Sequence, residues 1–291
     1  MTPPPDNGPN KRDRREDARE KARVAREAQA RKKRRNRVFI QGGIGVGILA
    51  IAAIVVLVIV SSVKPAGPGP LNMASDGILL KGNTSTGAIT ATKTAAIKAG
   101  GTPTATNDKK LTKTVNISVY IDYQCPYCDQ FETTNASQIQ TWLKEGAVTY
   151  EIHPLSILDA SSLGTKYSTR SANAAACVAN YDPNKFLAVT TAFYKNQPAE
   201  GTSGLTNSKI ISLVKKAGAT SSQIPSCITS GKFESWVAAA TKRALNDKLA
   251  NSSVAKVTGT PTVIVNGKQY SGSLTDASTF ESFVASTATT N

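Results

Sequence analysis

The sequence predicts an α/β domain with a helical insertion, and three observations lead to this fold class. The run Val115–Ile121 alternates apolar and polar residues, which is the period of a β-strand. Residues from about 157 to 250 carry apolar side chains at helical spacing. Near the C-terminus, an apolar run at 263–265 followed by Asn266-Gly267 is a β-hairpin signal. An order of strand, helix, strand, helical block and hairpin indicates an α/β domain whose insertion precedes the hairpin.

The N-terminal residues 1–37 form a strongly basic segment, with 14 Lys and Arg against 6 Asp and Glu. This segment holds more than half of the net charge of +15 of the 291-residue chain. It has no apolar face to bury, so we expect it to be disordered. The rest of the chain is only mildly basic, which argues against a nucleic-acid-binding core. We therefore expect no nucleic-acid partner, and a nucleic-acid-binding arm at 1–37 is the alternative.

Residues 38–63 form a charge-free, mostly apolar run of 26 residues. About 20 helical residues cross the ~30 Å hydrocarbon layer of a bilayer, so the run is long enough for a single transmembrane anchor helix. A cleaved signal peptide is the alternative, although its apolar stretch is usually about 7–15 residues. The basic segment precedes the span, so the N-terminus is expected in the cytoplasm and the remainder outside the cell membrane.

Residues 64–72, rich in Pro and Gly, are expected to be a linker, and residues 73–291 a folded domain. Within this domain, Gly77–Leu80 is a candidate edge strand and 147–153 a second strand of the main sheet. The helix after the first strand should end at Gly146. Asp276 is the expected N-cap of a last helix.

The motif Cys125-Pro126-Tyr127-Cys128 directly follows the strand 115–121 and begins a helix. Pro126 suits the first turn, where its missing N–H is not needed. Free backbone N–H groups and the helix dipole favour an anion there, so we expect Cys125 to be a reactive thiolate and Cys128 to resolve its mixed disulfides.

Half of a zinc site is one alternative for this motif, but no second CxxC or His pair completes it. A static disulfide is the second alternative, and a chance occurrence, against which the flanking pattern argues, is the third. We expect no metal, and no cofactor other than a redox-active Cys125–Cys128 disulfide.

Two segments carry a family resemblance. Residues 121–131, Ile-Asp-Tyr-Gln-Cys-Pro-Tyr-Cys-Asp-Gln-Phe, resemble the active-site segment of DsbA-like thiol-disulfide oxidoreductases. Residues 259–263, Gly-Thr-Pro-Thr-Val, resemble their second signature. The resemblance implies a thioredoxin-like fold over roughly 74–290, with Pro261 as a cis proline and Thr260 offering backbone groups to a substrate. The arrangement is similar to membrane-anchored actinobacterial members, which implies a membrane reoxidant similar to vitamin K epoxide reductase.

The motif departs from this family at two positions. Strongly oxidising relatives carry His at the position of Tyr127, and a neutral Tyr offers a neighbouring thiolate less stabilisation. Many relatives also carry a buried acid six residues before the first Cys, where this chain has Val119. Asp122 is the nearest acid and a candidate replacement; a solvated carboxylate at the strand end, or a charge placed near the helix, is the alternative. The only histidine, His153, is expected to be structural or on the surface.

Cys177 and Cys227 lie 50 positions apart in the helical block. In an oxidising compartment this pair is expected to form a structural disulfide, with an electron relay or two free thiols as alternatives. These expectations together favour a thiol oxidase that introduces disulfides into reduced secreted or cell-envelope proteins. A disulfide isomerase or reductase is the second hypothesis, and a non-catalytic thioredoxin-fold binding module is the third.

Overall fold

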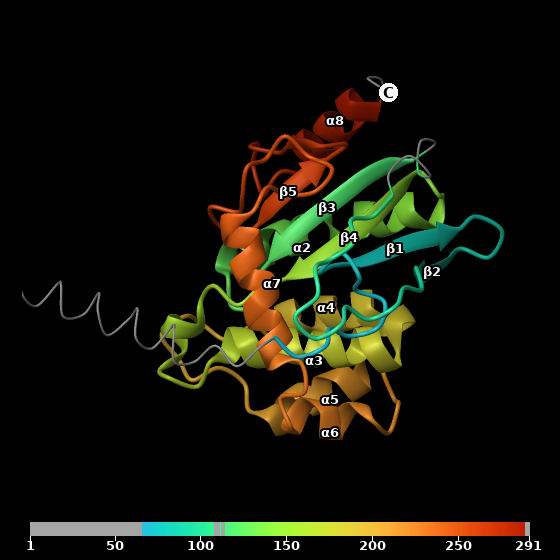
Figure 1. The fold of residues 1–291 in the computed structure, drawn as a ribbon. Helices are drawn as coiled ribbons and strands as arrows, with labels where there is room; N and C mark the ends of the chain where they lie inside the picture. Colours follow the sequence, from blue (N-terminus) through green and yellow to red (C-terminus); the bar gives the residue numbers. More distant parts are fainter. Residues whose placement is uncertain (1–65, 108–110, 112–113, 289–291) are drawn as a thin grey trace, which may run out of the picture. The chain divides into compact units, whose positions relative to one another are not determined.

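The computed structural model describes residues 66–107, 111 and 114–288 (Figure 1). The expected basic segment 1–37, the apolar span 38–63 and the first two residues of the linker lie outside these ranges. Within these ranges, no helix has the length and apolar character needed to cross a bilayer.

The domain is built on a six-stranded sheet with the order β2-β1-β4-β3-β5-β6. Neighbouring β3 and β4 are parallel, and every other neighbouring pair is antiparallel. The parallel pair is joined by α2, a right-sized crossover for a βαβ unit. The strands are β1 (Ile78–Asn83), β2 (Ala88–Ala91), β3 (Val115–Ile121), β4 (Val148–Pro154), β5 (Thr262–Val265) and β6 (Lys268–Gln269).

The helices cover both faces of the sheet and form a separate layer beside it (Figure 1). The helix α2 lies on one face, where its Phe131 meets Phe280 of α8 edge to face. On the other face lies α7, whose Ala244 packs with Tyr120 and Ile264 of the sheet. The helices are α2 (Pro126–Lys144), α3 (Tyr167–Tyr181), α4 (Phe186–Lys195), α5 (Asn207–Lys216), α6 (Ile224–Thr229), α7 (Glu234–Asn246) and α8 (Ala277–Ala288), with the short 3-10 helices η2 (Asp159–Ser162) and η3 (Pro183–Lys185).

The predicted hairpin is confirmed and joins β5 to β6. Its two turn residues, Asn266 and Gly267, have φ of 45° and 80°, the left-handed values that a two-residue I′ turn requires. The predicted N-cap is confirmed as well: the Asp276 carboxylate accepts hydrogen bonds from the backbone N–H groups of Ser278 and Thr279 at the start of α8.

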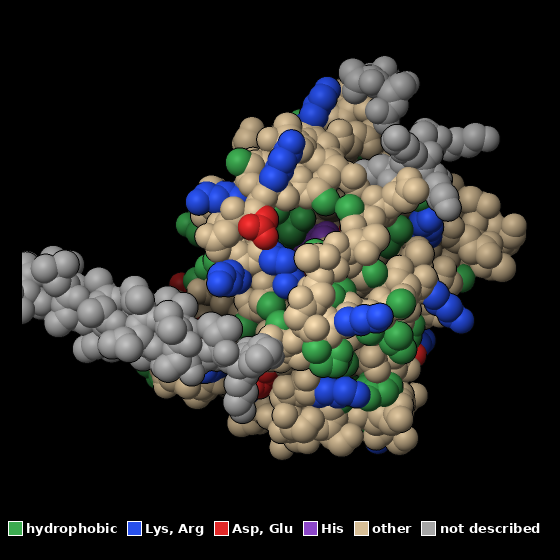
Figure 2. All heavy atoms as spheres, viewed as in Figure 1, with side chains coloured by type: hydrophobic (Ala, Val, Ile, Leu, Met, Phe, Trp, Pro, Cys, Tyr) green, Lys and Arg blue, Asp and Glu red, His purple; other side chains and the backbone are tan. Residues whose placement is uncertain are grey.

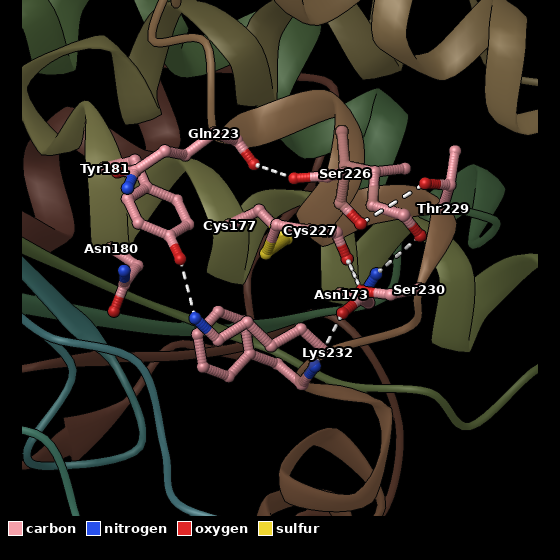
Figure 3. Close-up of a disulfide and its surroundings, with 12 residues drawn as sticks. Asn173, Cys177, Asn180, Tyr181, Gln223, Ser226, Cys227, Thr229, Ser230 and Lys232 are labelled. Carbon is pink, nitrogen blue, oxygen red and sulfur yellow. Dashed lines mark hydrogen bonds between the residues drawn. A yellow bond between two sulfur atoms is a disulfide. The ribbon is translucent and has the colours of Figure 1, made fainter.

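The helical insertion falls between β4 and β5, as predicted. Its central helix α3 is buried along almost its whole length, because α4, α5, α6 and α7 surround it. Figure 3 shows the disulfide that joins Cys177 of α3 to Cys227 of α6. The S–S distance is 2.01 Å and the two Cα atoms are 5.9 Å apart. Beside this disulfide, the Lys232 ammonium donates a 2.6 Å hydrogen bond to the Tyr181 hydroxyl (Figure 3).

Two sequence expectations differ from the structure. The strand predicted at 77–80 is present as β1, but its predicted place at the edge of the sheet is wrong. It is an interior strand between β2 and β4. The edge is taken by β2, a four-residue segment of sequence Ala-Ile-Thr-Ala, whose weak apolar pattern gave no strand signal. The end of the expected linker packs on the domain, since the N–H of Gly67 donates to the Ser235 hydroxyl of α7 and that of Gly69 to the Ile97 carbonyl.

Candidate functional site

The Cys125-Pro126-Tyr127-Cys128 motif lies where the chain leaves β3 and enters α2. Cys125 is the N-cap of α2, with extended backbone, and Pro126 occupies the first turn as predicted. Both thiols are free, and both residues are buried, with 3% and 1% of their surface exposed. Tyr127 is 60% exposed, so it forms the outer surface of the motif. The two sulfur atoms are therefore less accessible to solvent than they would be on an exposed loop.

The two thiols have opposite electrostatics. A hydrogen bond from the Cys128 thiol is the largest cause that lowers the pKa of Cys125, to about 6, against the opposing effect of burial. A hydrogen bond with the Thr260 side chain and the backbone N–H groups of Tyr127 and Cys128, at the start of α2, lower it further. For Cys128, burial is the largest cause and raises the pKa well above that of a free thiol. One sulfur is thus prepared to be an anion and the other to hold a proton.

The loop before β5 closes over these sulfurs. The Cys125 thiol donates a 3.2 Å hydrogen bond to the Thr260 carbonyl, although the two residues are 135 positions apart. The following peptide bond, Thr260–Pro261, is cis. The structure thus brings Thr260 and Pro261 to the motif, as the resemblance implied.

Asp122 is buried at the end of β3, with 0% of its surface exposed, so the alternative of a solvated carboxylate is wrong. Its Oδ1 accepts from the Gln124 N–H and the Ser168 hydroxyl. Its Oδ2 accepts from the N–H groups of Ile157 and Leu158. Burial raises the pKa of Asp122, and these hydrogen bonds oppose the rise. The carboxylate therefore ties the turn before Cys125 to the start of the helical insertion.

Sequence reasoning missed the glutamines that support this turn. The side-chain amide of Gln197, after α4, donates to the carbonyls of Tyr123 and Cys125, at 3.1 and 2.9 Å. The amide of Gln124 donates to the Ser161 carbonyl of η2. The insertion thus fixes the backbone that presents Cys125. No pattern in the sequence links Gln197 to a motif 72 positions away.

Sequence reasoning also missed Glu132. It follows Cys128 by one turn of α2 and lies on the buried face of that helix, between Phe131 and Asn135. Burial is the largest cause that raises its pKa, to about 7. A carboxylate inside the apolar stripe of an amphipathic helix was the signal that could have found it.

The remaining polar groups of the sheet are structural. His153 is buried, stacks on the Tyr120 ring with centroids 4.3 Å apart, and lies 3.8 Å from the Glu151 carboxylate. In the described part of the chain, no group of His, Cys, Asp and Glu side chains is arranged to hold a metal ion. On the face in Figure 2, Lys and Arg side chains lie scattered among uncharged ones and form no continuous basic patch.

The fold and the site define a thioredoxin-fold protein: a CxxC motif at the N-terminus of a helix, opposite a cis proline. The comparisons with known proteins agree. A family model described as Thioredoxin matches residues 111–285. The structure of reduced DsbA from Mycobacterium tuberculosis is 27% identical, with a TM-score of 0.50, and covers 73% of this chain and 99% of that one. Oxidised BdbD from Bacillus subtilis shares the fold at 17% identity, with a TM-score of 0.52 over 78% of this chain and 100% of that one.

A curated relative, the serine/threonine-protein kinase PknE of Mycobacterium tuberculosis, is 33% identical over 119 residues. This match covers 40% of the present chain and 21% of the kinase, so the chain spans only about a fifth of that relative's length. The chain belongs to the thioredoxin family, and within that family it is similar to the DsbA structure.

Proposed function

We propose that this protein is a membrane-anchored thiol oxidase that introduces disulfide bonds into secreted or cell-envelope proteins outside the cytoplasm. In this proposal a substrate thiolate attacks Cys125 of the Cys125–Cys128 disulfide, and Cys128 leaves. A second substrate thiolate then displaces Cys125, so that the substrate is oxidised by two electrons and the enzyme is left as a dithiol.

The observation that carries this proposal is the asymmetry between the two thiols. With a pKa of about 6, Cys125 is mostly a thiolate at neutral pH, whereas Cys128 stays protonated. A stabilised thiolate favours the reduced form of the pair, which makes its disulfide a better oxidant. It also makes Cys125 a good leaving group, so mixed disulfides with substrate are short-lived.

The second cysteine pair supports the location. The disulfide between Cys177 and Cys227 is the kind of bond that persists in oxidising compartments and is rare in the cytosol. The basic segment 1–37 and the apolar run 38–63 support an anchor with its N-terminus in the cytoplasm. Reoxidation would then fall to a membrane partner similar to vitamin K epoxide reductase. Residues 73–291 would form the catalytic domain, with the insertion at about 157–250.

Trapping of substrates tests this function. In the full chain expressed in its own host, Cys128→Ala should leave Cys125 joined to substrates, because Cys128 can no longer attack the mixed disulfide and release the substrate. The trapped proteins should be secreted or envelope proteins with several cysteines, released by reductant. Cys125→Ala is the matched control and should trap none. Absence of adducts from Cys128→Ala would favour the non-catalytic binding module.

A further inference from the structure

The proposed oxidation requires a proton at a place that water does not reach. When a substrate thiolate opens the disulfide at Cys125, Cys128 leaves as a thiolate. Cys128 is 1% exposed, and an unpaired anion in such a site is costly. Burial raises its pKa well above that of a free thiol, so this thiolate must be protonated. The reverse step, during reoxidation, must remove the same proton.

Asp122 is poorly suited to this transfer. Both of its oxygen atoms are occupied, because three backbone N–H groups and the Ser168 hydroxyl donate to them. Protonation would disturb these hydrogen bonds, which hold the turn before Cys125. Asp122 therefore acts in the structure as a fixed acceptor.

Glu132 has the opposite environment. It is 5% exposed, and its Oε1 atom is buried without a hydrogen-bond partner. Its Oε2 accepts only a long hydrogen bond of 3.5 Å from the Tyr150 hydroxyl. A buried carboxylate with so few donors holds a proton readily, and its pKa of about 7 lets it release one at neutral pH.

The Tyr150 hydroxyl of β4 donates to Glu132; burial is the largest cause that raises its pKa, and the charges of both Glu132 and Cys128 raise it further. Cys128 and Glu132 are also neighbours at i and i+4 on the buried face of α2. The titratable groups that act on Glu132, or on which it acts, are Tyr150 of β4, Tyr123 before α2, Tyr194 of α4 and Asp129 of its own helix. None of these four is a cation.

We propose that Glu132 is the proton donor and acceptor for Cys128, with the Tyr150 hydroxyl as the relay between them. This inference rests on the proposed exchange chemistry at Cys125 and Cys128. During substrate oxidation, the S–S bond breaks, Tyr150 gives its proton to the Cys128 thiolate, and Glu132 gives its own to Tyr150. During reoxidation the proton returns to Glu132 as the Cys128 sulfur forms its new S–S bond. The two electrons pass from substrate to disulfide and on to the oxidant, and no proton has to enter from solvent.

The test uses the reduced full chain and the aromatic disulfide DTNB, and the reaction is followed by stopped-flow absorbance across about pH 5–9, two units either side of neutrality. The Cys125 thiolate attacks DTNB and releases one thionitrobenzoate. Cys128 then loses its proton, attacks the Cys125 sulfur, and releases the second. The first phase reports Cys125 alone, and the second reports deprotonation of Cys128. In the wild type, the second phase should rise with pH around 7, where Glu132 ionises.

Glu132→Gln should leave the first phase unchanged and slow the second at pH 7 by roughly 100-fold, within the usual range for a lost general base. Its second phase should then follow the high pKa of Cys128 itself. Tyr150→Phe should slow the second phase and leave the rate of the first phase unchanged. Glu145→Gln, an exposed acid at the end of the same helix, is the charge control and should behave as wild type.

Two results would overturn the inference: a second phase in Glu132→Gln with the wild-type pH profile, or a loss of that profile in Asp122→Asn but not in Glu132→Gln. If the wild-type protein showed no first phase, Cys125 would not react with the disulfide, and this result would instead contradict the proposed function. Circular dichroism and the intact Cys177–Cys227 bond check that each variant is folded.

Discussion

The chain holds two cysteine pairs, and burial does not distinguish them. Cys125, Cys128, Cys177 and Cys227 are all at most 3% exposed. Cys177 and Cys227 come from the middle of α3 and from α6, 50 positions apart, and are bonded. Cys125 and Cys128 lie three positions apart at the first turn of α2 and are free. The comparison teaches that backbone position, and not depth in the protein, sets thiol chemistry here.

The physical cause is the supply of hydrogen-bond donors. At the start of α2 the backbone N–H groups have no intrahelical partner and are available to a sulfur anion. Cys125 receives these donors as well as the Cys128 thiol, and its pKa falls to about 6. Inside α3, the N–H groups near Cys177 already belong to the helix. A thiolate there would be unsolvated, so the favourable state of that pair is the disulfide.

The largest expected difference is in thiol exchange activity. Cys125→Ala should abolish oxidation of a reduced model protein, because the Cys125–Cys128 disulfide that accepts the electrons can no longer form. Cys177→Ala with Cys227→Ala should retain most of the activity at a temperature where the variant is folded. The measurement is the rate of regain of activity of a reduced, unfolded secreted enzyme. Equal losses in both variants would contradict the division of roles.

The next largest effect is on stability, and the order of the two pairs reverses. Removing the Cys177–Cys227 bond should lower the free energy of unfolding by roughly 4 kcal/mol, the chain-entropy value for a loop of this length. At or below pH 6, where the Cys125 thiolate contributes little, removing the Cys125 and Cys128 thiols from the reduced protein should change it far less, because they close no loop. Urea unfolding followed by tryptophan fluorescence gives both values. A loss below about 1 kcal/mol would mean that the helical insertion does not depend on its disulfide.

The third prediction concerns pH and uses Cys128→Ser, which keeps a donor beside Cys125 and prevents oxidation of the pair. Folding lowers the Cys125 pKa from about 9 to about 6. Its thiolate therefore stabilises the fold fully above pH 9, and this contribution is lost as the pH falls through 6. The stability of Cys128→Ser relative to Cys125→Ala/Cys128→Ser should thus rise between pH 6 and 9. A difference that is constant with pH would show that the thiolate is not stabilised by the fold.

The smallest expected effect comes from the exposed residue of the motif. Tyr127→His should make the pair more oxidising by at most about 30 mV, equivalent to about 1.4 kcal/mol, because a protonated imidazole stabilises the Cys125 thiolate but solvent screens it. Tyr127→Phe is the matched control and should leave the potential near the wild-type value. If Tyr127→His changes neither the potential nor the Cys125 pKa, electrostatics at this position do not tune the pair.

The sequence predicted the elements that local patterns define. The strand before Cys125, the helix after it, the hairpin at Asn266-Gly267 and the N-cap at Asp276 all depend on residues within a few positions of one another. The strand β2 escaped prediction because Ala88–Ala91 is short and weakly apolar, and its place in the sheet depends on pairing with β1. Because β2 was not predicted, the sequence could not show that β1 lies inside the sheet.

The site was predicted to the same extent and for the same reason. Cys125, Cys128 and Pro126 form one local motif, and the resemblance to DsbA-like proteins added Thr260 and Pro261. The support of Gln197 for the Cys125 carbonyl depends on the packing of the insertion against the motif, which no spacing reveals. Asp122 was found as a candidate but its environment was not, because its four donors come from residues 124–168.

The most direct test of the account is the reduction potential of the Cys125–Cys128 pair in the full chain. It is measured by equilibration with glutathione buffers, acid quenching, alkylation and mass spectrometry, with the Cys177–Cys227 peptide as an internal reference that should stay oxidised. Helix-end stabilisation of Cys125 without a histidine at Tyr127 predicts a value between about −270 mV, that of thioredoxin, and about −120 mV, that of the strongest DsbA oxidants. A value at or below that of thioredoxin would contradict the oxidase and identify the protein as a reductase.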